Sequence, residues 1–221
     1  MPQIKLSPSK LNLFLECPLC FWLESKGVHR PSGPFPSLPS GMDLAIKKYF
    51  DNYREKEQLP PELKGKVQGK LFDNMNLLKV WRNNRKGLSW TDESGDVLFG
   101  AIDDCLIHNG NYIIVDFKTR GFELKEDSAG FFQNQLDCYA LLLEKNGLKH
   151  PGFAYLIYYI PKEVKENGEV KFDVQVKKMK VDSSRALNTF RAAVNLLKEK
   201  KPEKHSECDF CSWADDNLKF E

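Results

Sequence analysis

Apolar and polar positions follow two different rhythms along this chain of 221 residues, and the rhythm changes near residue 96. Before that point, apolar residues recur at helical spacing and predict helices over 7–25, 43–56 and 66–83. Residues 30–40 hold four prolines and one glycine and predict an irregular loop. The sequence therefore predicts a helical N-terminal region over residues 1–95.

The pattern after residue 96 is that of strands joined by turns and helices. Residues 97–107 and 111–119 are rich in β-branched and aromatic side chains and predict two strands. Asn109-Gly110 lies between them and is the signal of a tight hairpin. Residues 152–160 form a continuous apolar run, which is typical of a central strand buried on both faces.

Two helices and one more strand complete the expected core. Residues 129–147 predict a helix, 170–181 predict a strand, and Asp182 supplies a capping side chain for the last helix. This order predicts an α/β layered fold. We expect residues 96–221 to form the core, with region 1–95 packed on it in one integrated domain.

Charge and composition narrow the function classes only a little. The formal net charge is +2, so bulk charge does not indicate a nucleic-acid partner. Lysines cluster at 177–180 and 198–204. Each cluster is either a solvated surface or the wall of a groove that meets phosphates.

The N-terminal segment and the cysteine content indicate in which cellular compartment the protein is expected. The opening MPQIKLSPSK has no apolar stretch of signal-peptide type. No segment approaches the roughly 20 apolar residues that span a bilayer. We therefore expect a cytoplasmic protein without a membrane partner. Thiols stay reduced there, so the six cysteines are expected to be metal ligands or buried residues rather than disulfides.

Two carboxylates and a lysine stand out in the predicted hairpin. Side chains alternate faces along a strand, so Asp116 and Lys118 share one face of 111–119. In 97–107, Asp103 lies on one face and Asp104 on the other, and the hairpin can bring Asp103 towards Asp116.

Such a pair of carboxylates suits a metal ion. Two neighbouring carboxylates repel unless one is protonated or a cation lies between them. Oxygen ligands suit Mg²⁺ or Mn²⁺, which can polarise a phosphodiester and activate water. Lys118 could orient that water and offset charge in the transition state. Spacing alone leaves open a salt-bridged pair on an exposed sheet face.

Three short segments carry a family resemblance. Gly100–Asp103, Asp116–Thr119 and Gln135–Tyr139 match the patterns G-x-(I/V)-D, D-(Y/F)-K-T and Q-x-x-x-Y, in this order, on two strands and a helix. Together they resemble the signature of RecB-like nucleases in the PD-(D/E)xK superfamily, which include CRISPR-associated exonucleases. The resemblance implies a restriction-endonuclease-like core, a mixed central sheet flanked by helices.

The resemblance also implies a role for each matched residue. It implies that two aspartates and a backbone carbonyl bind the metal ion, that a lysine is catalytic, and that a glutamine and a tyrosine hold the nucleic-acid backbone or the site geometry. These residues are Asp103, Asp116, the carbonyl of Phe117, Lys118, Gln135 and Tyr139.

One departure from the family pattern concerns the metal. RecB-like members usually carry a metal-binding histidine soon after a glycine in an earlier helix. The matching segment here is Gly41–Ala45, which contains no histidine. Asp43 is the candidate substitute as an oxygen ligand. Its alternative interpretation is an ordinary aspartate near a helix N-terminus, which the helix dipole favours.

Four of the cysteines form two C-x-x-C pairs at opposite ends of the chain. Paired C-x-x-C spacing predicts a four-thiolate metal site, with zinc or an iron–sulfur cluster as the metal. The ligands are Cys17, Cys20, Cys208 and Cys211, whereas Cys105 and Cys138 are expected to be small buried residues.

Family resemblance favours the cluster over zinc. The opening Ser7–Lys10 with Cys17-Pro18 is similar to the start of RecB-like nucleases, many of which bind a [4Fe–4S] cluster through one cysteine near the start and three near the end. The arrangement here is two and two. In either case the metal would hold the two ends of the chain together and be structural.

The resulting hypothesis is a Mg²⁺- or Mn²⁺-dependent DNA nuclease. We expect an exonuclease that acts on single strands or free ends in DNA repair, recombination or CRISPR-type processing. Two alternatives remain open. One is a nucleic-acid-binding module with a weak or inactive site, and the other is a subunit that acts only within a larger repair or CRISPR complex.

Overall fold

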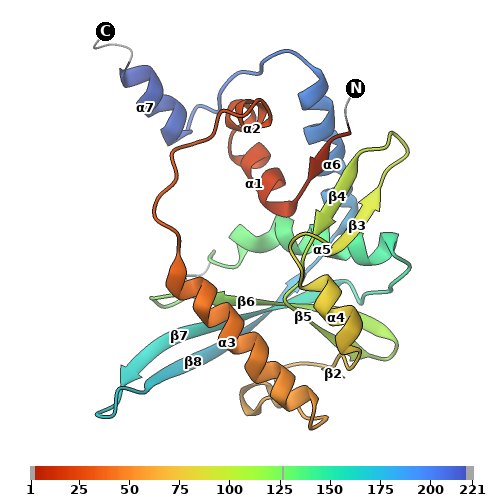
Figure 1. The fold of residues 1–221 in the computed structure, drawn as a ribbon, viewed down its shortest axis with the longest axis vertical. Coiled ribbons are helices and arrows are strands. Elements are labelled where there is room, and N and C mark those ends of the chain that lie inside the picture. Colours follow the sequence, from red (N-terminus) through yellow and green to blue (C-terminus); the bar gives the residue numbers. More distant parts are fainter. Residues whose placement is uncertain (1–2, 126, 218–221) are drawn as a thin grey trace.

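A mixed five-stranded sheet forms the centre of the protein (Figure 1). The computed structural model describes residues 3–125 and 127–217. The strand order is β2-β5-β6-β7-β8, with β6 and β7 parallel and the other neighbours antiparallel. The strands are β2 Lys70–Leu71, β5 Asp104–His108, β6 Asn111–Thr119, β7 Phe153–Val164 and β8 Val170–Lys180.

A second, three-stranded sheet lies beside the first. Its order is β1-β4-β3, and the N-terminal strand β1 runs parallel to β4. Its strands are β1 Lys5–Leu6, β3 Leu88–Thr91 and β4 Val97–Gly100. The part of the chain before residue 96 therefore contributes three short strands in addition to its helices.

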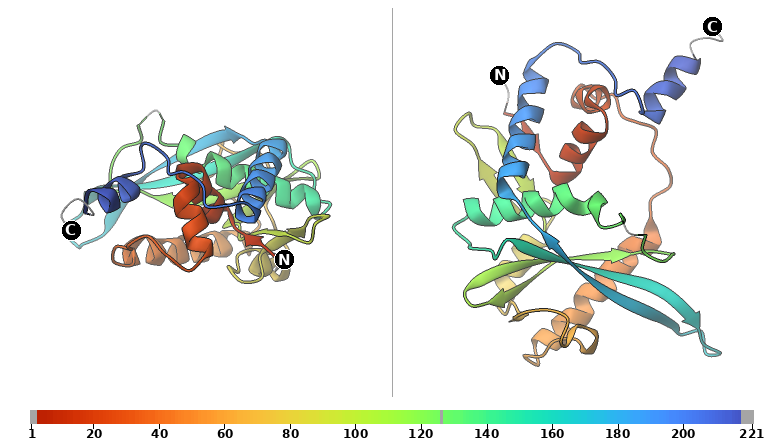
Figure 2. Two further views of the ribbon diagram at one scale, coloured as in Figure 1. Left: turned by 90° about the horizontal axis from the view of Figure 1, so that it is seen from above. Right: turned by 180° about the vertical axis from the view of Figure 1, so that it is seen from behind.

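Helices cover both faces of the central sheet and gather at one end of the molecule. Figure 2 shows α5 lying across the sheet in the view from behind, and α6 standing beside α1 and α2. The helices are α1 Pro8–Glu16, α2 Pro18–Ser25, α3 Ser37–Arg54, α4 Met75–Trp81, α5 Gln133–Lys145, α6 Ser183–Lys198 and α7 Asp209–Asn217, with short 3₁₀ turns at Pro61–Leu63 and Gly130–Phe132.

Side chains on the two faces of β6 pack in two separate hydrophobic cores. Ile113, Val115 and Phe117 pack with Phe50 of α3. Ile114, on the opposite face, packs in the cluster that includes the apolar side chains of α5. This is the alternation expected of a strand covered on both sides. The site residues on the Ile114 face of β6 consequently meet α5.

Several sequence predictions are confirmed. Strand β6 has the predicted bounds, and the turn before it places Asn109 and Gly110 at positive φ, as a tight hairpin requires. Strand β7 pairs on both sides and is buried from Ala154 to Ile160. Asp182 caps α6 by accepting hydrogen bonds from the backbone of Ser184 and Arg185. The mixed sheet flanked by helices is the predicted fold class.

The prediction of one strand over 97–107 is wrong. The segment divides into β4 and β5, which belong to different sheets, and the chain turns at 101–103. The backbone N–H of Ile102 donates to the carbonyl of Trp81, and Arg82 Nε donates to the carbonyl of Asp103. These partners come from α4 and the residue after it, so local alternation could not reveal the break.

The N-terminal helices also differ from the prediction. The helix predicted over 7–25 is divided at Cys17, which is extended, because Pro18 restricts the residue before it and begins a new helix. The helix predicted over 66–83 is reduced to α4, with β2 before it. Helix α3 begins at Ser37, inside the predicted loop, and α7 was not predicted.

Among residues 3–125 and 127–217, no helix is both long enough and apolar enough to cross a bilayer.

Candidate active site

The end of strand β6 presents an aspartate and a lysine on one face. Lys118 Nζ lies 2.5 Å from Asp116 Oδ2, and both residues share the face that α5 covers. The Asp116 side chain is almost fully buried, whereas Lys118 is partly exposed. Strand periodicity alone placed these two side chains together, because residues two apart on a strand point the same way.

Asp103 reaches the same strand from the turn between β4 and β5. Its Oδ2 accepts a 2.9 Å hydrogen bond from the backbone N–H of Phe117, between Asp116 and Lys118. The side chain is partly exposed. Asp103 is therefore anchored beside Asp116 by a backbone contact, although it is not part of a strand as predicted.

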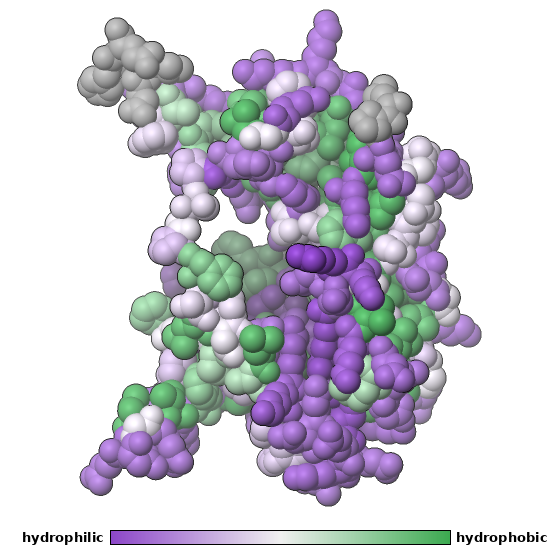
Figure 3. Space-filling view, in the orientation of Figure 1, coloured by the Kyte–Doolittle hydropathy of each residue, from purple (hydrophilic) through white to green (hydrophobic). Residues whose placement is uncertain are grey.

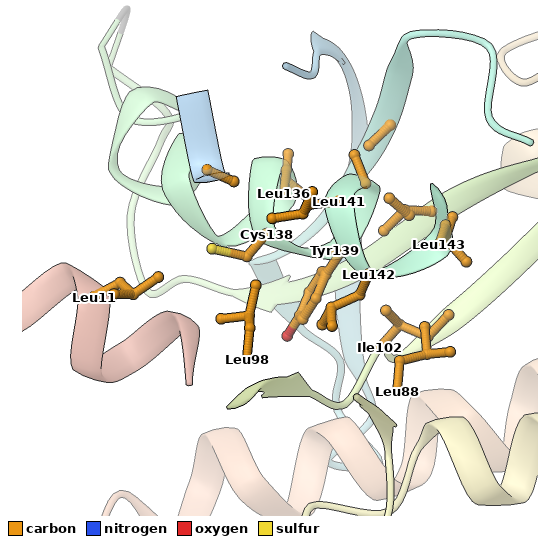
Figure 4. Packing of buried hydrophobic residues seen from close by; sticks show 14 of the residues in the cluster. Leu11, Leu88, Leu98, Ile102, Leu136, Cys138, Tyr139, Leu141, Leu142 and Leu143 are labelled. Atoms are coloured by element: carbon orange, nitrogen blue, oxygen red, sulfur yellow. The ribbon is translucent and has the colours of Figure 1, made fainter. Parts of the chain in front are cut away.

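Helix α5 supplies the amide and phenol that support the lysine. Lys118 Nζ donates to Gln135 Oε1 at 3.1 Å, and Gln135 Nε2 donates to the hydroxyl of Tyr139 at 2.8 Å. Gln135 and Tyr139 are one helical turn apart, as the sequence predicted. Figure 4 shows Tyr139 projecting from α5 towards Leu98. The three side chains form one hydrogen-bonded chain.

The carboxyl group of Asp116 has an unusually high pKa for an aspartate. Burial, and then the nearby charge of Asp103, raise the pKa of Asp116 to about 7 although Lys118 opposes the shift. Burial also raises the pKa of Tyr139 well above its usual value, so its hydroxyl stays protonated. A carboxyl group that keeps a proton near neutral pH, next to a second carboxylate, is a group that a divalent cation would ionise.

A second lysine, which the sequence analysis missed, enters the site from α3. Lys47 Nζ lies 2.8 Å from Asp103 Oδ1 and 2.7 Å from Asp43 Oδ2. Burial works against its charge, but Asp103 and Asp43 outweigh that effect and raise the pKa of Lys47. The i,i+4 spacing of Asp43 and Lys47 was the available signal for this pair. Asp43 therefore lies against Lys47 in this structure.

A buried ion network supports the site from the other face of the sheet. Asp104, fully buried, contacts Arg54 at 2.5 Å and Arg82 at 2.8 Å. Asp51 contacts both arginines as well. Arg82 also holds the backbone carbonyl of Asp103. The network fixes the turn that carries Asp103, and the sequence analysis identified only that Asp104 points away from the site.

The donor set fits a divalent cation. Asp116 Oδ2 lies near Lys118 but accepts no hydrogen bond of suitable geometry among the described residues. Asp103 stands next to it, so two carboxylates converge where hydrogen bonds do not satisfy all the oxygens. Hard oxygen donors of this kind suit Mg²⁺ or Mn²⁺.

The four predicted cysteine ligands also come together. The sulfur atoms of Cys17, Cys20, Cys208 and Cys211 all lie within 4.8 Å of one another, and all four residues are buried. Burial opposes ionisation of Cys17, but hydrogen bonds from the backbones of His205 and Cys20 outweigh it and lower its pKa to about 6. The cluster can hold a metal, and it joins α2 to the start of α7.

Arg30 is an additional partner of the cysteine cluster that the sequence did not reveal. Its Nη2 donates to Cys208 Sγ at 3.6 Å, and its guanidinium stacks over Phe210. Arg30 lies in the segment that leads from α2 to α3. The remaining cysteines, Cys105 and Cys138, are single buried residues as predicted.

The fold and the site together define a restriction-endonuclease-like protein, with two carboxylates and a lysine at the end of a central strand. The PD-(D/E)XK nuclease superfamily model matches residues 38–215, and the chain belongs to this superfamily. Members are nucleases that use divalent metal ions and act on nucleic acid.

No curated protein matches the chain. A solved structure entitled "Crystal structure of SSO0001" is 17% identical, with a TM-score of 0.48, over 97% of this chain and 85% of that chain.

Proposed function

We propose that this protein is a DNA exonuclease of the RecB-like group that requires Mg²⁺ or Mn²⁺. The observation that carries the proposal is the position of Lys118, held between the buried Asp116 and Gln135. A lysine held in place beside two convergent carboxylates is the arrangement expected of a site that cleaves phosphodiesters. A purely structural ion pair would not need the second carboxylate. We place the activity in DNA repair, recombination or CRISPR-type processing, on its own or within a larger complex.

Three groups would hold the divalent ion. They are the carboxylates of Asp103 and Asp116 and the backbone carbonyl of Phe117, whereas Asp43, the further candidate from the sequence, is paired with Lys47. When bound, the ion supplies Lewis-acid polarisation of the phosphate and a more acidic water. The protein's own contribution is to hold these oxygens in place before substrate arrives.

Lys118 would act on the substrate directly. Its ammonium is held by Asp116 and by Gln135 Oε1, and it lies 4.2 Å from the centre of the Phe132 ring. With its position fixed, Lys118 can orient the attacking water and offset negative charge that develops on the phosphate. Gln135 and Tyr139 keep the ammonium in that position.

Exposed apolar side chains that are close to the site residues in the sequence support a single-stranded substrate. Large apolar side chains are exposed close to the site residues in sequence: Phe122 is 82% exposed, Phe131 73% and Leu44 69%. Exposed aromatic rings can stack on unpaired bases without sequence preference. In the view of Figure 3 the surface of the molecule is hollowed, with both apolar and hydrophilic residues around the hollow.

The cysteine site would be a structural metal centre. Three of its sulfur–sulfur separations are 3.5, 3.7 and 3.8 Å. A tetrahedral ion with metal–sulfur distances of about 2.3 Å has sulfurs about 3.8 Å apart. This spacing supports zinc, whereas the family resemblance supports a [4Fe–4S] cluster. An absorbance spectrum with metal analysis of anaerobically purified protein separates the two, because only the cluster is coloured.

A cleavage assay tests the nuclease proposal. Wild type, Lys118→Ala and the exposed control Lys165→Ala would be incubated with labelled single- and double-stranded DNA and Mg²⁺ or Mn²⁺. We expect wild type and Lys165→Ala to shorten single strands from an end, and Lys118→Ala to leave them intact. A wild type that binds DNA but cuts no better than Lys118→Ala would instead be a binding subunit, which the missing histidine would favour.

A further inference from the structure

Lys47 is a second lysine at the carboxylate site, and nothing in the nuclease assignment accounts for it. It comes from α3, whereas Lys118 comes from β6. Its Nζ lies 2.8 Å from Asp103 Oδ1, and its side chain is only 17% exposed. An ammonium group held this far from solvent loses hydration, so it needs the carboxylates that surround it.

Both oxygens of Asp103 are already engaged. Oδ2 accepts from the backbone N–H of Phe117, and Oδ1 faces Lys47. A divalent ion that binds Asp103 at Oδ1 would lie next to the Lys47 ammonium. Two cations at contact distance repel strongly where water is scarce. Binding of a divalent ion at this oxygen would therefore favour movement of Lys47 away from Asp103. Asp43, the other partner of Lys47, lies on the same helix.

Formal charge indicates how many ions the site needs. The carboxylates of Asp43, Asp103 and Asp116 face the ammonium groups of Lys47 and Lys118, so the group carries −1 when all five are ionised. One divalent ion and one phosphodiester bring the total to zero. Two divalent ions with the same phosphodiester leave it at +2, which a partly buried site disfavours.

We propose that Lys47 is a catalytic residue that takes the role of a second metal ion. In the metal-free protein its ammonium neutralises Asp103. With one divalent ion held by Asp103 and Asp116, Lys47 would turn to a non-bridging oxygen of the scissile phosphate. Asp43 then serves to hold Lys47 rather than the ion. This inference rests on the proposed nuclease function.

Measurements of metal binding test, without any cleavage, whether Lys47 competes with a divalent ion for Asp103. Mn²⁺ would be titrated into wild type, Lys47→Met and Lys48→Met, and followed by electron paramagnetic resonance of the free ion. Mn²⁺ prefers oxygen ligands, so the cysteine site does not compete for it. Lys48 is the matched control, because it is the next residue on α3 and is exposed.

We expect one Mn²⁺ per chain in wild type and in Lys48→Met. Lys47→Met should bind Mn²⁺ roughly tenfold more tightly, since the competing charge is gone. Lys47→Arg keeps the charge and should bind it like wild type, which also controls for damage to folding. Unchanged or weaker Mn²⁺ binding by a folded Lys47→Met overturns the competition between Lys47 and the ion.

The rate of cleavage at saturating Mn²⁺ tests whether Lys47 contacts the scissile phosphate. Lys47→Met should lose on the order of a hundredfold in kcat, as expected when one donor to transition-state charge is removed, and Lys48→Met should lose nothing. If Lys47→Met cuts as fast as wild type, the phosphate contact is wrong while the nuclease function stands. If wild type cuts nothing, the nuclease function fails, and the Mn²⁺ comparison still decides whether Lys47 competes for Asp103.

Discussion

A side chain at position 100 would collide with Tyr139: a Cβ built on Gly100 lies 2.9 Å from Cε1 of the tyrosine ring. Leu142 lies 3.2 Å from the same point. Both neighbours belong to buried α5, so neither can yield easily. The glycine of the first motif therefore allows β4 to approach the helix that holds Lys118 through Gln135.

Gly100→Ala tests this packing. We expect it to shift Tyr139, weaken the hydrogen-bonded chain to Lys118 and lower the free energy of unfolding by about 1–3 kcal/mol, the usual range for overpacking a core. Urea unfolding and the rate of DNA cleavage measure the two effects. Gly130→Ala is the control, because a Cβ there meets nothing within 4 Å. Equal stability of the two variants would contradict the packing role.

The buried charge of Asp104 should matter more for stability than any surface pair. Asp104→Asn leaves Arg54 and Arg82 without their buried partner, and we expect unfolding to become easier by roughly 3 kcal/mol. The control is Asp73→Asn, since Asp73 and its partner Lys70 are both 72% exposed. That change should alter stability by less than about 1 kcal/mol. Chemical denaturation of both variants gives the comparison.

Metal affinity at the carboxylate site should depend on pH. Burial and the neighbouring Asp103 raise the pKa of Asp116 to about 7, so Asp116 holds a proton below that pH. A metal ion must displace this proton, and Mn²⁺ affinity should therefore rise with pH up to about 7 and level off above it. Calorimetry across pH measures this, with proton release at low pH as a second reading. Affinity that is flat from pH 5 to 8 would be inconsistent with a protonated Asp116.

Loss of a cysteine ligand should remove the metal and loosen both ends of the chain. We expect Cys208→Ser to lower the bound metal per chain and the melting temperature, because α2 and the start of α7 are then no longer joined. Cys138→Ser is the control, since Cys138 is buried in α5 away from the cluster. Its metal content should equal that of wild type. Retention of full metal by Cys208→Ser would exclude Cys208 as a ligand.

The interface of Arg30 with the cysteine site gives a separate prediction. Arg30→Met removes the hydrogen bond to Cys208 and the stacking on Phe210 while leaving all four sulfurs in place. We expect the metal to remain bound but to be lost faster to a chelator. Arg191→Met, on α6, is the control. The rate of metal loss, followed with a colorimetric chelator, decides whether Arg30 protects the site.

The sequence by itself determined the parts of this protein that local periodicity encodes. Alternation along 111–119 placed Asp116 and Lys118 on one face, and the four-residue spacing of Gln135 and Tyr139 placed both on one side of a helix. The paired C-x-x-C motifs predicted the cluster of four cysteine sulfurs. Each of these relationships depends on residues close together in the chain or on a well-defined ligand spacing.

Only the tertiary structure decided how distant elements meet. Alternation cannot tell one sheet from two, so the break between β4 and β5 and the anchoring of Asp103 by Arg82 were invisible in the pattern. Lys47 and Asp103 are 56 positions apart in the chain, and their contact follows from the packing of α3 over β6. Contacts of this kind depend on how whole faces pack together, and no single segment contains that information.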